Sequence, residues 1–160
     1  MCNKVAVADL IIDEWLWADL SGENTRDAQR EAFKFLQAIY SKCDRVVTVK
    51  GSRFDQKLFG LWSQRDITRN RIARFYKDSF RYNSDKTVIL EENELEELPE
   101  QLAAEVKDDD QYLVRAYLTS NASEFVTTDN DLKDVLIRHG IASKHRQEFV
   151  LTYISQYGQK

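Results

Sequence analysis

Proline and glycine are scarce in this chain. One proline and five glycines occur among 160 residues, so the sequence has no long flexible linker. No internal repeat is found, and hydrophobic residues make up 42% of the total, enough to build a core at this length. We therefore expect residues 1–160 to form a single domain.

Cysteine and histidine are equally rare. Cys2 and Cys43 lie far apart without the spacing of a metal site, which favours two reduced thiols in a cytoplasmic protein, with Cys43 buried near a helix end. His139 and His145 are six positions apart, which is not a helical ligand spacing, so surface positions are favoured over zinc binding.

Long hydrophobic runs are absent. No apolar stretch approaches the length of a membrane span, and the first residues, MCNKVAVADLIIDEW, carry an acid within their apolar stretch, unlike a signal peptide. We expect no membrane partner. The net charge of −4 excludes a basic field over the whole protein as the route to nucleic acid and leaves only local patches.

Short β-branched runs alternate with amphipathic helical segments. Strands are predicted at KVAVA (residues 4–8), DRVVTVK (44–50), KTVIL (86–90) and EFVTT (124–128), with helices at about 27–43, 108–121 and 130–139. This alternation is typical of crossover units in a parallel α/β sheet. Residues 144–160 fit a helix or a strand equally well.

Several aspartates follow the predicted strands. Asp9 ends the first strand and Asp129 the strand EFVTT, while Asp110 opens a helix with its apolar face toward the interior and Asp109 is nearly as well placed. Ligands of parallel sheets bind beyond the carboxyl ends of the strands. Each acid taken alone is better explained as a helix cap, or in the case of Asp131 as a first-turn acid. Taken together, they would repel one another unless a cation joined them.

Such a cluster suits one kind of chemistry. Carboxylate oxygens are the ligands that Mg²⁺ and Mn²⁺ prefer, together with waters and substrate phosphates. Metal-assisted hydrolysis of a phosphodiester needs no histidine or cysteine. The sequence has no Walker loop, no G-x-G-x-x-G and no H-E-x-x-H, so the other common phosphate and metal motifs are missing.

Three stretches, VAVADLII, DDDQYLVRAYL and FVTTDNDL, resemble the acidic landmarks of PIN-domain nucleases. The resemblance implies a three-layer α/β/α sandwich with a central, mainly parallel sheet of four to five strands. It implies an endoribonuclease that uses Mg²⁺ or Mn²⁺ to cleave single-stranded RNA, as a toxin or an RNA-processing enzyme. Family members are often dimers or are held by an antitoxin, so a homodimer and an antitoxin or other protein partner are the implied assemblies.

The resemblance also implies roles for individual residues. Asp9, Asp110 and Asp129 match the first, third and fourth acids of the family, and Asp55 is the best match to the second. Thr128 matches a hydroxyl that often helps to orient the site, and Asp131 looks like a supporting metal ligand. Asp109, beside Asp110, is a further candidate metal ligand because of its position.

Residues 64–81 hold six basic residues and two acidic ones, with aromatic residues between them. The basic side chains could steer RNA phosphates toward the acidic edge or could form a solvated helix face. The aromatic spacing favours core packing over base stacking. The candidate RNA-binding residues are Arg65, Arg69, Arg71, Arg74 and Lys77.

Two alternatives to a nuclease stay open. Two departures from the family pattern, Asp55 where glutamate is usual and Leu10 after Asp9, fit a degenerate PIN-like module that binds RNA or protein without cutting. A receiver-like phosphoacceptor domain would need an acidic pair near the first strand, an aspartate ending a central strand and a later lysine at a strand end. The acids that open the helix at Asp108 fit that third class poorly.

Overall fold

The computed structural model describes residues 7–62 and 66–158, and their centre is a five-stranded parallel sheet. The central strand β1 is buried along its whole length, as expected of a parallel strand covered on both faces. In spatial order the strands are β3 (Thr87–Leu90), β2 (Arg45–Val49), β1 (Asp9–Ile12), β4 (Ala122–Thr127) and β5 (Ser143–His145).

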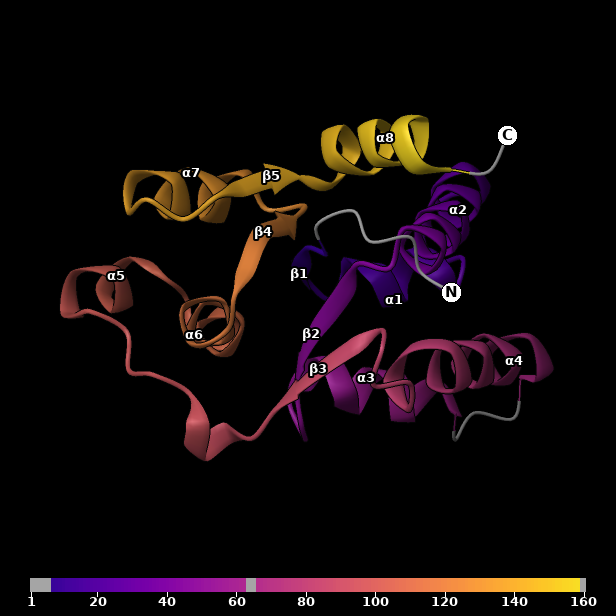
Figure 1. The fold of residues 1–160 in the computed structure, drawn as a ribbon, viewed down its shortest axis with the longest axis horizontal. Helices are drawn as coiled ribbons and strands as arrows, with labels where there is room; N and C mark the ends of the chain where they lie inside the picture. The colour runs from indigo at the N-terminus through magenta and orange to yellow at the C-terminus, as the bar shows by residue number, and fades with distance from the viewer. Residues whose placement is uncertain (1–6, 63–65, 159–160) are drawn as a thin grey trace.

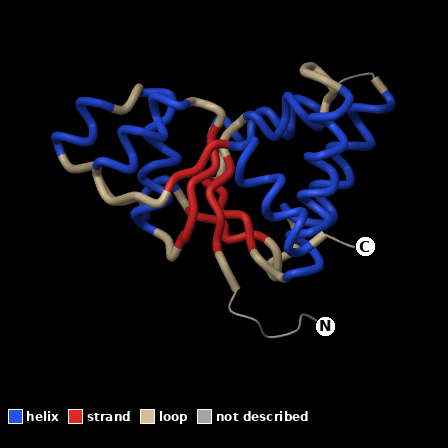
Figure 2. Tube along the Cα trace, turned by 90° about the horizontal axis from the view of Figure 1, so that it is seen from above, coloured by secondary structure: helices blue, strands red, loops and turns tan. Residues whose placement is uncertain are grey.

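Helices cover both faces of the sheet, and Figure 2 shows the strands between the two groups. Side chains alternate along β1: Leu10 and Ile12 enter one core cluster, and Ile11 enters the other. This arrangement confirms the predicted α/β class with three layers. The first face carries α1 (Trp15–Leu20), α2 (Arg26–Lys42), α3 (Arg53–Trp62), α4 (Ile67–Tyr76) and α8 (Arg146–Tyr157). The second carries α5 (Glu100–Glu105), α6 (Gln111–Thr119) and α7 (Asn130–Arg138), at the left of Figure 1.

The strand order creates a switch point between β1 and β4. From β1 the chain builds β2 and β3 on one side, and it then returns to place β4 and β5 on the other. Helix α1 leaves β1 on the first face, whereas α7 leaves β4 on the second. The carboxyl ends of β1 and β4 therefore lie at the topological position of the crevice in which parallel sheets bind ligands.

The first strand differs from its prediction. Residues 4–6 lie outside the described residues, and the strand begins at Asp9 rather than ending there. Asp9 is tolerated at the start of a buried strand because Arg45, its register partner on β2, holds both carboxylate oxygens at 2.8 and 2.9 Å. The acid that follows this strand is Asp13.

The other sequence predictions concern better-defined segments. Strands β2 and β3 lie within the predicted runs, whereas β4 begins two residues before its predicted run and ends one residue before the end of that run. Helices α2 and α7 are found where helices were predicted. The segment from Asp108 begins as a short 3₁₀ turn (Asp108–Asp110) before α6. The ambiguous C-terminal stretch is both elements in turn, since β5 ends at His145 and α8 begins at the next residue.

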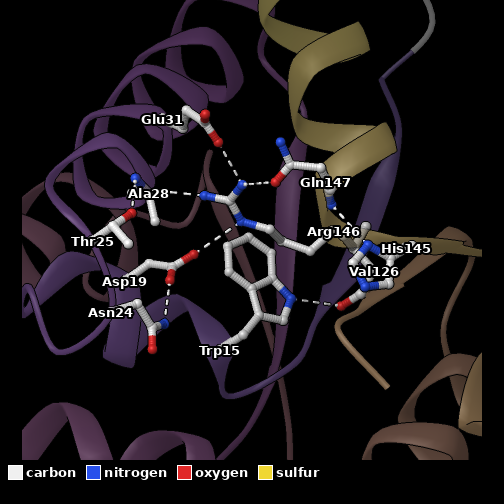
Figure 3. Close-up of polar contacts among 10 residues, drawn as sticks. All are labelled: Trp15, Asp19, Asn24, Thr25, Ala28, Glu31, Val126, His145, Arg146 and Gln147. Atoms are coloured by element: carbon white, nitrogen blue, oxygen red, sulfur yellow. Dashed lines mark hydrogen bonds and ion pairs between the residues drawn. The ribbon is translucent and has the colours of Figure 1, made fainter. Parts of the chain in front are cut away.

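A buried arginine fixes α1 against its neighbours (Figure 3). The Arg146 guanidinium, 5% exposed, contacts Asp19 of α1 at 2.9 Å, and it also contacts Glu31 and the Ala28 carbonyl of α2. It lies over the ring of Trp15, whose Nε1 donates to the Val126 carbonyl of β4 at 2.9 Å. Because α1 starts directly after Asp13 and Glu14, this network holds the crevice side of α1 in place.

The state of the Cys43 thiol differs from its prediction. Cys43 is buried at the end of α2 as predicted, but it takes part in a disulfide bond, so the expectation of a reduced thiol is wrong. Disulfides persist mainly in oxidising compartments, and the cytoplasmic location stays a prediction.

Within residues 7–62 and 66–158, none of the helices has the length and apolar character needed to cross a membrane.

Candidate active site at the carboxyl edge of the sheet

Asp13 is the acid at the carboxyl end of β1. Its backbone N–H still bonds to the Val126 carbonyl of β4 at 3.1 Å, so the residue is held at the switch point. Its carboxylate accepts from the Thr127 hydroxyl at 2.9 Å and from the Glu14 N–H at 2.6 Å. Burial raises the pKa of Asp13, and the negative charges of Glu14 and Asp129 act in the same direction, against its two hydrogen bonds.

Asp110 and Asp129 complete the acidic cluster from the other side of the crevice. Each sits at the N-cap position of a helix, Asp110 on α6 and Asp129 on α7. Asp129 also makes the cap bond, accepting from the Leu132 N–H at 3.1 Å, whereas Asp110 makes no side-chain cap bond. Burial, followed by the charges of Asp13, Asp129 and Glu14, raises the pKa of Asp110 to about 6. Asp13 and Asp129 are therefore close enough to Asp110 to oppose its ionisation.

This pKa shift predicts how stability depends on pH. Because the pKa of Asp110 rises from 3.8 to about 6 in the folded chain, the folded state resists ionisation that the unfolded state accepts freely. The contribution of Asp110 to the free energy of unfolding is therefore full below pH 3.8 and is lost as the pH rises to about 6. In an Asp110→Asn variant, denaturant unfolding across this range should show a smaller fall in stability than the wild type. Asp108→Asn is the matched control on the exposed neighbour, and parallel wild-type and Asp110→Asn curves would contradict the prediction.

Basic and phenolic groups frame the acids on the α3 side. Glu14 is contacted by Lys57 at 2.9 Å, by Arg53 at 3.5 Å and by the Tyr112 hydroxyl at 3.3 Å. Arg53 also holds Asp109 at 2.8 Å, and this hydrogen bond raises the pKa of its guanidinium. Arg53 thus bridges α1 and the 3₁₀ turn before α6, and it keeps positive charge beside the carboxylate cluster.

Two of the acids that were predicted to be catalytic lie outside the cluster. Asp9 is at the amino end of β1, on the edge of the sheet opposite the crevice, because the strand begins with it. Asp55 is in α3 near the carboxyl end of β2, but it is 1% exposed and both of its oxygens are taken by Arg81, at 2.9 and 2.8 Å. It also accepts from the Gly51 N–H at 3.1 Å. The structure therefore does not bring Asp9 to Asp110 and Asp129, and it commits Asp55 to an internal ion pair.

The residues that were predicted to support the site are exposed. Thr128 is exposed, and the hydroxyl that orients an acid is that of the preceding residue, Thr127, on Asp13. Asp131 is exposed in the first turn of α7, where an acid is favourable for the helix dipole. Asp109 is exposed and paired with Arg53. These three residues lie around the cluster rather than within it.

The donor set fits a divalent cation in its chemistry. Asp13, Asp110 and Asp129 supply hard oxygen ligands, and their mutual repulsion is the condition that a bound cation relieves. In the described part of the chain, no three acidic, histidine or cysteine side chains are already arranged closely enough to hold a metal ion. Binding of Mg²⁺ or Mn²⁺ would therefore have to draw these carboxylates together.

The described part of the basic stretch, residues 66–81, is exposed at some positions and buried at others. Arg65 lies outside the described residues, while Arg69, Arg71 and Arg74 are on α4 and Lys77 opens the π-helical turn Lys77–Arg81. Its aromatic residues belong to the first core, as the spacing predicted. Tyr76 and Phe80 are fully buried and stack with their ring centroids 5.2 Å apart.

A cavity of about 450 Å³ opens beside the cluster, between α1 and α3. Glu14, Arg53 and Lys57 line the end nearest the acids, and Glu23 and Leu61 line it farther along. A cavity of this size is in the range that accommodates a small molecule or a nucleotide. The cluster therefore has an adjoining space for a substrate.

Sequence reasoning missed Asp13, and a usable signal was present. The run DLII is apolar after its first residue and is followed directly by an acid and a helical pattern, the same arrangement that drew attention to Asp129. Arg53 and Lys57 are four positions apart, so they share one face of α3, but their acidic partner on another helix is not readable from the sequence.

No protein-family model matches the sequence, and the curated proteins include no significant match to it.

Proposed function

We propose that this chain is a Mg²⁺- or Mn²⁺-dependent endoribonuclease that hydrolyses phosphodiester bonds of single-stranded RNA, of the PIN type that its acidic blocks resemble. The observation that carries the proposal is the gathering of Asp13 and Asp129 around Asp110, whose pKa burial and these charges raise to about 6, at the switch point of a parallel sheet. A protein gains nothing in stability from such a cluster unless it binds a cation or a proton.

The roles of the residues follow from their positions. Asp13, Asp110 and Asp129 would hold the divalent ion, with Asp13 replacing Asp9 as the acid of the first strand. The ion would supply activation of the attacking water and stabilisation of the leaving oxygen. Thr127 orients the Asp13 carboxylate through its hydroxyl, at 2.9 Å. Arg53 and Lys57 place positive charge at the entrance, where a phosphate would arrive.

A cleavage assay tests the proposal. Labelled single-stranded RNA incubated with the purified chain should be cut in Mn²⁺ or Mg²⁺ and should stay intact in EDTA. An Asp129→Asn protein purified in the same way should leave the RNA intact in either metal, which excludes a contaminating nuclease. Cleavage that persists in EDTA, or that is equal in the Asp129→Asn protein, would remove the proposal.

A degenerate, non-cutting RNA- or protein-binding module is the second candidate. The Asp55–Arg81 pair favours this candidate, because it occupies Asp55, the best match to the second acid of PIN-domain nucleases. It is also favoured by the pairing of Glu14 with Lys57, which leaves one fewer free carboxylate at the cluster. RNA binding without cleavage in any divalent metal would decide for this candidate. An antitoxin, a homodimer partner and a cytoplasmic location belong to either version as proposals.

A further inference from the structure

A second cavity, of about 490 Å³, lies on the outer side of the first helical layer between α2 and α4. Arg30 and Lys34 reach it from α2, and Arg71 reaches it from α4. Its apolar lining is Phe33, which is half-buried, and Ile72, which is buried. The cavity thus combines positive side chains with an apolar surface, the combination that binds a phosphate together with a base or sugar.

The charges around this cavity are unbalanced. Among the described residues that line it, none is acidic. Within residues 7–62 and 66–158, the side chains of Arg30, Lys34 and Arg71 form no ion pair and no hydrogen bond, in contrast to Arg53 and Lys57. Arg30 and Lys34 are also four positions apart on one helix, a spacing at which like charges destabilise the helix. The arrangement costs stability in the free protein, and an anion would relieve it.

Helix α1 connects this cavity with the cavity beside the acids. The α1/α3 cavity starts at Glu14 and reaches Glu23 in the turn between α1 and α2. Gln29, which lines the α2/α4 cavity, donates from its side chain to the Leu20 carbonyl at 2.8 Å, at the end of α1. A hydrogen bond thus joins a residue that lines the second cavity to the end of α1, and other residues of α1 line the first cavity.

We propose that the α2/α4 cavity binds a nucleotide of a single-stranded RNA at a distance from the scissile bond. Arg30, Lys34 and Arg71 contact backbone phosphates, and Phe33 and Ile72 contact the base or sugar. The strand runs from the acids along the α1/α3 cavity and past the turn after α1. This inference rests on the proposed function for the identity of the ligand. Of the basic residues in the stretch 64–81, the proposal uses Arg71, and it adds Arg30 and Lys34 of α2.

Binding measured without cleavage tests the inference. Affinity for a labelled single-stranded RNA of twelve nucleotides is measured in EDTA over a range of salt concentrations. In the triple variant Arg30→Gln, Lys34→Gln, Arg71→Gln, affinity should fall by about 10–100-fold, and the slope of log affinity against log salt should become shallower by about 2, since each phosphate contact on a single strand contributes about 0.7. The control triple variant, with the same change in net charge on the α7–β5 side, is Lys133→Gln, Arg138→Gln, Lys144→Gln.

The outcomes separate this inference from the proposed function. An unchanged slope in the first triple variant, or an equal loss in both variants, overturns the cavity as a binding site, even if the wild type cuts RNA. A loss confined to the first variant supports the cavity, even if no metal produces cleavage. Absence of RNA binding by the wild-type chain overturns it as well. Thermal unfolding of each variant, expected near the wild-type temperature because all six side chains are at the surface or half-buried, confirms that the proteins compared are folded.

Discussion

Replacing Asp13 by asparagine should reduce RNA cleavage about 10³-fold, because a bound metal stabilises developing charge by several kcal/mol and each 1.4 kcal/mol corresponds to a factor of ten. The substitution keeps one oxygen that can accept from Thr127 and loses the bond that the other oxygen accepts from the Glu14 N–H. Burial and neighbouring charges raise the pKa of Asp13, so removal of the charge should offset the lost bond and leave stability close to that of the wild type. Single-turnover cleavage in Mn²⁺, together with thermal unfolding, measures both effects.

The matched control is Asp9→Asn. Asp9 is an aspartate on the same strand, four positions away, whose carboxylate is occupied by Arg45 at the amino end of β1. Its loss should leave the cleavage rate close to that of the wild type. The reverse pattern, with Asp9→Asn inactive and Asp13→Asn active, would restore the assignment expected from the sequence and would contradict the site described here.

Replacing Asp55 by asparagine should lower the free energy of unfolding by about 3–5 kcal/mol, the cost of leaving one partner of a buried pair uncompensated. Asp55 and Arg81 are 1% and 7% exposed, and their contact is bidentate. The hydrogen bond with Asp55 raises the pKa of Arg81 in the wild type. Arginine ionises far above neutral pH even without such a partner, so the guanidinium stays charged after the substitution. For a chain of this size the midpoint of thermal unfolding should fall by about 10 °C, at roughly 2–4 °C per kcal/mol.

Activity distinguishes a structural Asp55 from a catalytic one. At a temperature where Asp55→Asn is still folded, its cleavage rate should approach that of the wild type. Glu97→Gln, which removes an exposed carboxylate 3.6 Å from Arg115, should leave the unfolding temperature unchanged and serves as the matched substitution. A stable but inactive Asp55→Asn protein would return Asp55 to the site.

The sequence predicted the two acids whose environment is local. Asp110 and Asp129 were expected at helix starts, and each is an N-cap residue of its helix. Such positions are readable because an N-cap is defined by the few residues on either side of it. The class of fold was readable for a similar reason, since the alternation of strand and helix patterns decides between parallel and antiparallel architectures.

The ion pairs of Asp9 and Asp55 were not predicted, because their partners are distant in the chain. Asp9 is paired with a residue 36 positions away and Asp55 with one 26 positions away. Without those arginines, an acid at a strand or in an apolar helix looks unpaired and therefore functional. Pairing across elements depends on register and packing, which composition and periodicity do not specify.

The distance along the chain between the residues that meet at the site has a consequence for when the site can form. Asp13 and Thr127, which touch at the switch point, are separated by 114 positions, and β2 and β3 come between β1 and β4 in the chain. Contacts of such separation form late and slowly, because a long loop must be closed before they contribute. The carboxylates therefore meet only in a chain that has been synthesised through β4 and α7. A ribosome-bound intermediate that lacks those elements would be unable to cut RNA.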